Sequence, residues 1–315
     1  MGNLFIIGNG FDLAHYLPTS YQDFYEYLKN IYPDALDIEP TFSIEGQDMP
    51  DGSLHFNKDE VVAFIIDIIS KAEKNGDDWQ DIETSLGRLN YDSYFDEMSY
   101  IFGHEDDDSS YFRMANRNET VASNFHLVTL KFKELFAEWI ETIDTSEVKS
   151  IQSFDDLVEP YDDTFLTFNY TDVLETVYGA IDVKHIHVHV AHRNGWVKEE
   201  LIIGHGEKSR DFQNRYTGSE GSLLRIHDSL RKNTQKIIER EHEFFNNLTS
   251  IEKIYSYGFS FSNVDLPYIK EICSRLNTMN ITWFLHDYGK KEDREKFKKI
   301  IRECGFKGEI KEFSA

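Results

Sequence analysis

The sequence predicts an α/β protein with a doubly wound, mostly parallel β-sheet. Residues 4–7 form a short apolar segment that ends directly at a glycine, as a buried parallel strand does before a tight turn. Strand-like segments recur along the chain, at residues 164–168, 183–190, 200–203, 254–257, 281–285 and 309–312. Helical patterns follow several of these segments, from about residue 172, from about residue 264 and over 290–303. Such alternation is typical of a Rossmann-like sheet with helices on both faces.

The long region between the first two predicted strands has helical patterns instead. Helices are expected at residues 21–28, 60–71 and 124–143 and from about residue 78, whereas 31–56 and 104–110 are expected to be irregular. We therefore expect one α/β domain, residues 1–315, with a helical insertion over about 21–150. Another long helix is expected at 222–248.

The composition excludes several classes of function. The 315 residues carry a formal net charge of −24, and so acidic a surface repels polyphosphate, which makes nucleic acid a poor partner. The two cysteines, Cys273 and Cys304, form no CxxC pair, so a four-cysteine zinc site is excluded and a reducing compartment is favoured. The N-terminal segment lacks the basic start of a signal peptide, and no run of ~18 apolar residues occurs. We expect a cytoplasmic protein that does not bind a membrane.

A turn with two glycines directly follows the first predicted strand. Glycine permits a tight turn and a close approach of the backbone to phosphate, so we assign Gly8, Asn9, Gly10 and Phe11 to nucleotide binding. The third glycine of the usual dinucleotide fingerprint is replaced by Leu13, and a plain tight turn is the alternative.

Four polar side chains follow this turn closely, at Asp12, His15, Thr19 and Tyr21. We expect them to contact the ligand. Helix capping by Asp12 and Thr19 is the alternative.

The second predicted strand ends at Asn169, and open α/β sheets bind ligands at the ends of their strands. An amide there can orient a ribose hydroxyl or a water molecule, and a structural role in the turn is the alternative. Tyr170, beside it, is assigned to ligand binding. Asp172 and Glu175 have capping-box spacing, so we expect them to cap the helix that follows.

Histidines recur in the predicted strand at residues 183–190. His185, His187 and His189 alternate and would share one face of that strand, and His192 and His205 follow. A histidine suits general-base catalysis, and three on one face could instead bind a metal. Because no HExxH or comparable acidic pairing accompanies them, we expect no metal site.

Glu83 borders the apolar stripe of the helix expected from about residue 78, close to Trp79 and Asp81. A carboxylate in that position needs a partner. The partner of Glu83 is either a ligand hydroxyl or a basic side chain in an ion pair. We assign Glu83 to ligand binding.

A third strand–turn–helix junction lies near residue 260. Gly258, Ser260 and Asp265 are assigned to ligand binding at the same sheet edge as the first turn, and Ser262 or Asn263 is expected to cap the next helix. The spacing GxSxS differs from the GxSxG nucleophile elbow, so a serine hydrolase is not supported.

Six of these segments together resemble the bacteriophage abortive-infection AbiH family. They are FIIGNGFDLAHYLPTSYQDF at 5–24, WQDIE at 79–83, FNYTDVLE at 168–175, HIHV at 185–188, IIGHG at 202–206 and YSYGFSFSNVD at 255–265. That family is in turn similar to the sirtuin-like domains of defence NAD hydrolases. The resemblance implies a sirtuin-like fold in which a glycine-rich turn, an asparagine at a strand end and a histidine cleave the nicotinamide–ribose bond of NAD.

Carried over by position, the turn is Gly8 to Phe11, the asparagine is Asn169 and the histidine is His187. We expect Asn169, His187 and Asp12 to be catalytic, NAD to be the substrate or ligand, and no other cofactor to be needed. The resemblance also implies an unknown phage trigger or regulatory partner, and it allows a homo-oligomer. A non-catalytic sensor of NAD or ADP-ribose and a metal-dependent nuclease or phosphatase are the alternative functions.

Overall fold

The computed structural model describes residues 2–44, 46–50, 52, 54–73, 82–102, 108–187, 201–206 and 216–315. The chain forms two compact units. The first consists of Met1–Ser20, Ile140–Ile202 and Asn233–Ala315. The second consists of Tyr21–Trp139 and Ile203–Lys232. The second unit thus contains most of the region that the sequence predicts as a helical insertion, together with a segment from much later in the chain.

The first unit is built on a six-stranded sheet. Its strands are β1 (Gly2–Ile7), β4 (Thr164–Thr167), β5 (Asp182–His185), β6 (Ile251–Tyr257), β7 (Thr282–His286) and β8 (Glu309–Phe313). They lie in the order β5-β4-β1-β6-β7-β8, and every neighbouring pair is parallel. The chain proceeds from β1 outward to β5, then returns beside β1 and proceeds outward to β8. This order confirms the predicted doubly wound, Rossmann-like sheet.

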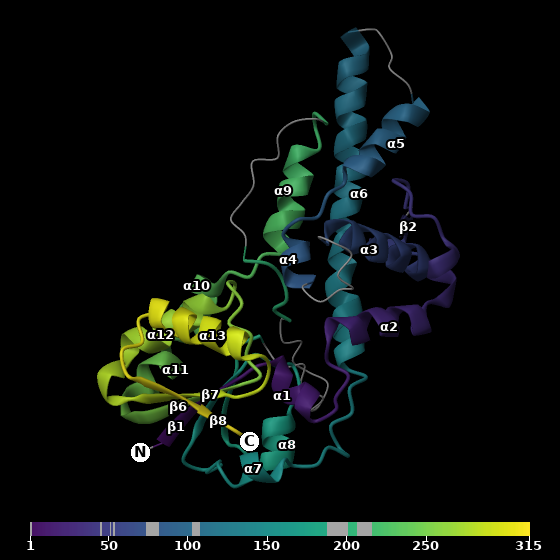
Figure 1. Cartoon of the computed structure of the whole chain (residues 1–315). Coiled ribbons are helices and arrows are strands. Elements are labelled where there is room, and N and C mark those ends of the chain that lie inside the picture. Colours follow the sequence, from purple (N-terminus) through teal and green to yellow (C-terminus); the bar gives the residue numbers. More distant parts are fainter. Residues whose placement is uncertain are drawn as a thin grey trace. The chain divides into compact units, whose positions relative to one another are not determined.

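Helices cover both faces of this sheet (Figure 1). They are α1 (Asn9–Ala14), α7 (Gln152–Asp155), α8 (Val173–Tyr178), α10 (Thr234–Arg240), α11 (His242–Asn247), α12 (Leu266–Arg275) and α13 (Lys291–Glu303), with 3-10 turns η2 (Leu248–Ser250) and η3 (Thr278–Asn280). In β1, Leu4 and Ile6 pack with α10 to α13, whereas Phe5 and Ile7 pack with α1, α7 and α8. Alternate side chains of one strand therefore enter two separate cores, which explains why Leu4 to Ile7 are apolar at every position.

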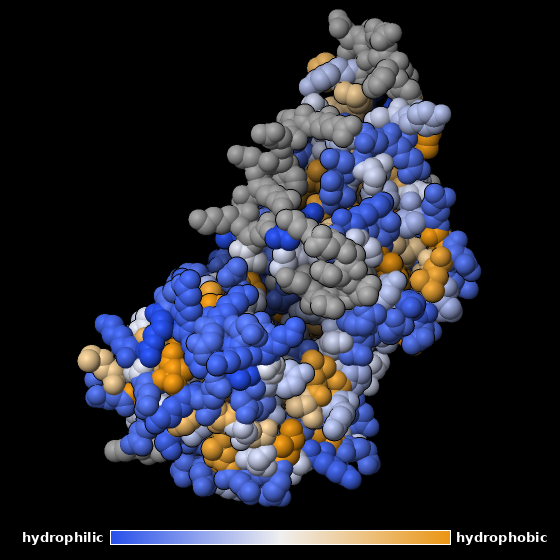
Figure 2. All heavy atoms as spheres, in the orientation of Figure 1, coloured by the Kyte–Doolittle hydropathy of each residue, from blue (hydrophilic) through white to orange (hydrophobic). Residues whose placement is uncertain are grey.

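The outer surface of this unit is polar where its helices face water. Figure 2 shows hydrophilic residues over most of the visible surface of α12 and α13. The apolar residues of the same helices, Ile272 and Ile301, are fully buried. The two helices are thus amphipathic, as expected for a layer between sheet and solvent.

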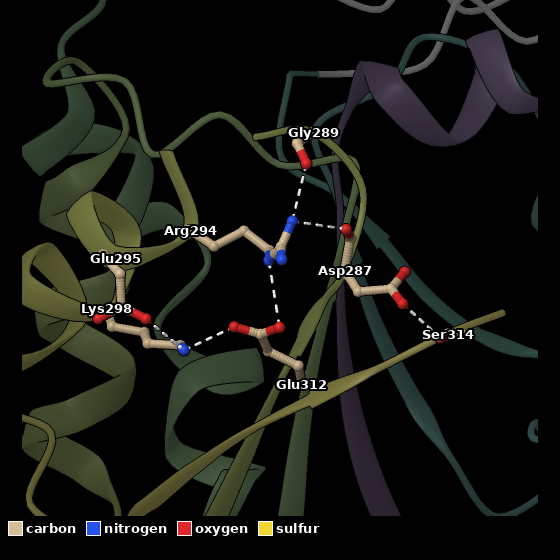
Figure 3. A network of polar contacts seen from close by, with 7 residues as sticks. All are labelled: Asp287, Gly289, Arg294, Glu295, Lys298, Glu312 and Ser314. Carbon is tan, nitrogen blue, oxygen red and sulfur yellow. Dashed lines mark hydrogen bonds and ion pairs between the residues drawn. The ribbon is translucent and has the colours of Figure 1, made fainter. Parts of the chain in front are cut away.

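The predicted edge strand at 309–312 is confirmed as β8, and charged side chains of α13 hold it (Figure 3). Arg294 Nε donates to Glu312 Oε2 at 3.2 Å, and Lys298 Nζ donates to Glu312 Oε1 at 2.6 Å. Arg294 also donates to the carbonyls of Asp287 and Gly289. Charges on an edge strand oppose pairing with another chain, so this network both anchors β8 and protects it.

The second unit is mainly helical. Its elements are α2 (Tyr21–Ile31), η1 (Pro33–Asp37), β2 (Gly46–Asp48), β3 (Leu54–Phe56), α3 (Lys58–Ala72), α4 (Ile82–Leu86), α5 (Asp92–Phe102), α6 (Asp108–Ile140, whose last residue belongs to the first unit) and α9 (Glu220–Ser229). Aromatic rings form much of its core, and Phe24 contacts the rings of Phe132, Phe136 and Trp139.

Several predicted elements are wrong. The helix expected at 222–248 is three helices, because the chain turns after α9 and Asn233 caps α10 by accepting the N–H of Lys236. The strand expected at 183–190 ends at His185, and its last three residues lie outside the described part. Residues 201–203 are not in a strand. The irregular region at 31–56 contains η1 and the β2–β3 hairpin, and the loop expected at 104–110 is helical from Asp108.

The turns that follow β1 and β6 lie against each other. The N–H of Gly8 donates to the Tyr257 carbonyl and that of Gly10 to the Gly258 carbonyl, each at 3.0 Å. A Cβ atom on Gly10 would lie 2.7 Å from the Gly258 Cα. Gly258 has a φ of +63°, and a Cβ there would lie 2.3 Å from the backbone nitrogen of Phe11. These glycines therefore allow two backbones to touch, which fixes the carboxyl ends of β1 and β6.

We predict that Gly10→Ala destabilises the fold by about 2 kcal/mol or more, because the added methyl group overpacks a backbone contact. Gly221→Ala is the control, since Gly221 lies in α9 and a Cβ there would meet nothing within 4 Å. Urea denaturation measures both. A Gly10→Ala variant as stable as the unmodified protein would show that the two turns separate at little cost.

Candidate functional site

A buried carboxylate, Asp12, lies in α1 just beyond the carboxyl end of β1. Only 1% of the residue is exposed. Its Oδ1 accepts a hydrogen bond from Asn169 Nδ2 at 2.8 Å, and its Oδ2 accepts one from Thr171 Oγ1 at 2.7 Å. Both donors come from the loop between β4 and α8. Because β1 and β4 are parallel neighbours with Ile7 opposite Thr167, the segments that follow them meet at the same sheet edge.

Burial raises the pKa of Asp12 from its ordinary value of 3.8 to about 7. The hydrogen bonds from Thr171 and Asn169 and the charge of His185 favour the ionised form and oppose this rise, whereas Asp172 adds to it. A carboxylate that changes charge near neutral pH at the end of a sheet strand is a strong candidate for a functional group.

Asn169 is held by three contacts and leaves one acceptor open. Its side-chain N–H binds Asp12, its backbone N–H donates to Thr167 Oγ1 at 3.1 Å, and its carbonyl faces His185 Nδ1 at 3.4 Å. Its Oδ1 is buried and has no hydrogen-bond partner among the described residues. A buried acceptor without a partner costs about 1–3 kcal/mol, so a ligand hydroxyl or water bound there would recover that energy.

His187, the predicted catalytic histidine, is not on a strand face. It lies two residues beyond the end of β5 and is 4% exposed. Its Nδ1 is 3.2 Å from the Phe168 carbonyl, and its Nε2 is 3.5 Å from Oδ1 of Asp265, which is also buried. The structure therefore brings His187 to the backbone directly before Asn169, and it places Asp265 beside the same ring.

His185 lies on the other side of the Asn169 backbone. Its Nε2 is 2.7 Å from Glu175 Oε1. The predicted capping box is therefore wrong. Asp172 does occupy the N-cap position of α8, but it accepts from Thr145 Oγ1 at 2.7 Å instead of capping, and Glu175 faces His185. Capping-box spacing also suits a carboxylate that faces a neighbouring strand, so spacing alone did not reveal this partner.

The first turn is arranged differently from the expected phosphate cradle. The N–H of Gly10 donates to Gly258, and that of Phe11 donates to the Gly8 carbonyl, so neither group is free to point at a phosphate. Asn9 is exposed, and its side chain donates to the Thr19 carbonyl at 2.8 Å. The Thr19 hydroxyl is buried without a hydrogen-bond partner in the described part of the chain, so it does not cap α2.

His15 lies in the interior of the first unit. Its Nδ1 is 2.7 Å from the Phe11 carbonyl and its Nε2 is 2.6 Å from the Tyr178 hydroxyl, which also accepts the N–H of Ile151. Burial lowers the pKa of His15. A neutral ring that donates from Nδ1 and accepts from Tyr178 satisfies all three groups, so His15 supports the position of α1.

The third junction contributes Asp265 but not the expected caps. Asp265 itself occupies the N-cap position of α12, and the helix begins at Leu266 without a side-chain cap, so capping by Ser262 or Asn263 is wrong. Ser260 is exposed. Tyr170 donates to the Ile202 carbonyl at 3.0 Å, which fixes its ring at 5.9 Å from that of His187.

The remaining predicted residues belong to the second unit or lie outside the described residues. Glu83 Oε1 is 2.5 Å from Lys232 Nζ, whose side chain is fully buried. Tyr21 begins α2, and the ring of His205 lies 4.2 Å from that of His227 in a tilted contact. Trp79, Asp81, His189 and His192 lie outside the described residues. Where the structure describes the chain, no three histidine, cysteine or acidic side chains gather as a metal site would require.

Comparison with known protein families places this arrangement in context. The family model described as bacteriophage abortive infection AbiH matches residues 4–287. The chain belongs to the AbiH family. No curated protein and no solved structure matches it. The AbiH match contains Asp12, Asn169, His187 and Asp265. It ends after β7, so α13 and β8 lie beyond it.

The AbiH assignment confirms the resemblance stated above and indicates a role in abortive infection by bacteriophage. None of the helices in the described residues is long and apolar enough to cross a membrane.

We predict that Asp12→Asn changes how the stability of this AbiH protein depends on pH. Because the pKa of Asp12 is raised in the folded state, the folded protein holds this proton more tightly than the unfolded chain. Stability from this group is therefore fully present at low pH and is lost as pH rises through about 7, by roughly 4 kcal/mol. The asparagine side chain has no charge to bury. The free energy of unfolding of the variant should therefore rise, relative to that of the unmodified protein, as pH increases from 5 to 8.

Urea denaturation at several pH values measures this difference, with the exposed Asp162→Asn as control. A stability difference between Asp12→Asn and the unmodified protein that is the same at pH 5 and pH 8 would contradict the raised pKa.

Proposed function

We propose that this AbiH protein is an antiphage effector that hydrolyses NAD at the bond between nicotinamide and ribose. The observation that carries the proposal is the pairing of buried Asp12 with Asn169, whose Oδ1 has no partner within the described residues. Both lie at the carboxyl edge of a Rossmann-like sheet, which is where such sheets bind nucleotides. A carboxylate and an open amide acceptor are the groups that a ribose undergoing substitution needs.

The chemistry makes modest demands on the protein. The C1′–N bond breaks, its electron pair neutralises the pyridinium nitrogen, and nicotinamide leaves without needing a proton. Positive charge then develops on the ribose, and water forms the new C1′–O bond and loses a proton. Ionised Asp12 would stabilise the developing charge and receive this proton. Asn169 Oδ1 would accept a hydrogen bond from a ribose hydroxyl or from the attacking water.

His187 would assist the transfer of the proton away from the site. Its ring is oriented by the Phe168 carbonyl at one nitrogen and faces Asp265 at the other. A histidine fixed next to a buried carboxylate is suited to relay a proton. The pyrophosphate would lie along the exposed residues Asn9 and Ser260, which flank the contact between the two turns, since the N–H groups of Gly10 and Phe11 are already used.

We predict that the purified protein converts ε-NAD to its fluorescent product and that EDTA does not prevent this. Asn169→Ala should lower kcat by about 10²–10³-fold, and His187→Gln should retain nucleotide binding but lose turnover. The exposed residues Asn277 and His242 supply the controls, as Asn277→Ala and His242→Gln. Each variant is first checked for an unchanged melting temperature.

The outcome separates the alternative functions. Binding of NAD by calorimetry without any turnover would replace the proposal with a nucleotide sensor. Cleavage of nucleic acid or phosphate esters that stops in EDTA would replace it with a metal-dependent hydrolase.

We further predict that kcat/KM for NAD rises with pH and levels off above about pH 7. The reason is that Asp12 must be ionised to act, and its pKa is about 7. Steady-state rates between pH 5 and pH 9 test this. A profile that is flat, or that falls across this range, would remove Asp12 from the chemical step.

A further inference from the structure

His185 and Glu175 form a partly buried pair next to Asp12 that the proposed chemistry does not use. His185 is the last residue of β5 and lies opposite Thr167 of β4. Its side chain is 11% exposed, and that of Glu175 is 34% exposed. Besides facing Glu175 at 2.7 Å, the ring faces the Asn169 carbonyl at 3.4 Å. Both ring nitrogens thus face oxygen acceptors, an arrangement that a doubly protonated imidazole satisfies.

The contact with His185 satisfies one of the two carboxylate oxygens of Glu175. One carboxylate oxygen binds His185, and the other, Oε2, is buried without a hydrogen-bond partner among the described residues. Glu175 lies in the first turn of α8, directly after the loop that carries Asn169 and Thr171. The pair therefore joins β5 to α8 across the base of the loop whose side chains bind Asp12.

We propose that His185 and Glu175 are positioning residues that hold the Asn169–Thr171 loop and set a positive charge against the Asp12 carboxylate. The proposal deepens the function proposed above, because it concerns the same carboxylate, but its first test needs no turnover.

The pair acts on Asp12 through the charge of His185. Asp12 is faced by Asn169 and Thr171 through hydrogen bonds, by Asp172 through an unfavourable charge and by His185 through a favourable one. His185 is in turn faced by Glu175 and by the Asn169 carbonyl. Burial and Asp172 both favour protonated Asp12, and the charge of His185 opposes them. Glu175 is the residue that orients the His185 ring, through the contact at 2.7 Å.

The test is the titration of Asp12 itself, followed by NMR of protein labelled with ¹³C at aspartate carboxyl groups. The Asp12 resonance is identified as the one absent from Asp12→Asn. In His185→Gln its titration midpoint should move upward by about 1 pH unit or more, because an opposite charge nearby typically lowers a carboxyl pKa by roughly 1–3 units. Glu175→Gln should move the midpoint in the same direction. His185→Lys keeps a positive charge at this position, so its midpoint should lie close to that of the unmodified protein.

His242→Gln is the matched control, since His242 is an exposed histidine of the same unit that faces only the Glu239 carbonyl in the described contacts. An Asp12 midpoint that is unchanged in His185→Gln would overturn the proposal, whether or not the protein hydrolyses NAD. Where turnover is measurable, the pH profile of kcat/KM should move with the NMR midpoint. Absence of turnover in all variants, together with a shifted midpoint, would reject the NAD reaction and retain the positioning pair.

Discussion

The hydrogen bonds between Asp12 and the loop after β4 are the interaction on which the candidate site depends. They require Asp12 to be at the carboxyl end of β1 and the loop to be beside it, which the parallel pairing of β1 with β4 ensures. They also require α1 to begin immediately after the strand. The backbone contact of Gly8 and Gly10 with Gly258 fixes that start, because side chains there would separate β1 from β6. The glycines therefore act on the site through packing.

Burial of Asp12 costs folding energy, and the surrounding residues reduce that cost without removing it. Two donors and a neighbouring histidine favour its ionised form, yet its pKa remains about 7. A chain selected for stability alone would do better with an apolar or neutral side chain at this position. Such a poorly compensated charge is expected where a reaction needs a carboxylate of adjustable protonation, since stability and activity then make opposite demands.

The sequence was sufficient to predict the sheet because β1 and β7 have three or more consecutive apolar residues, β4 and β6 are rich in apolar and aromatic residues, and turn residues follow these strands. It also led to Asp12 and Asn169, whose position at strand ends follows from the topology, whereas His187 was selected through the family resemblance. The break between α9 and α10 could not be predicted, since the polar residues around Asn233 also suit the exposed face of a continuous helix. The end of β5 at His185 was missed because an alternating His-x-His pattern continues past it. Thr171 and Glu175 gained their partners only from tertiary contacts.

Contacts in the second unit bear on which carboxylate suits the reaction proposed above. The sequence predicted Asp12 as a catalytic carboxylate and Glu83 as a ligand-binding one. Glu83 lies 2.5 Å from the fully buried ammonium group of Lys232, whose backbone N–H is held by the carbonyl of His205. A carboxylate already neutralised by a buried cation has little attraction left for another positive charge, and separating the two would leave a buried ion unpaired. Within the described residues, the hydrogen bonds that Asp12 accepts come from the neutral side chains of Asn169 and Thr171, and the nearby charge of His185 favours its ionised form. These contacts therefore suit Asp12 to the role proposed for it above and give Glu83 a structural role.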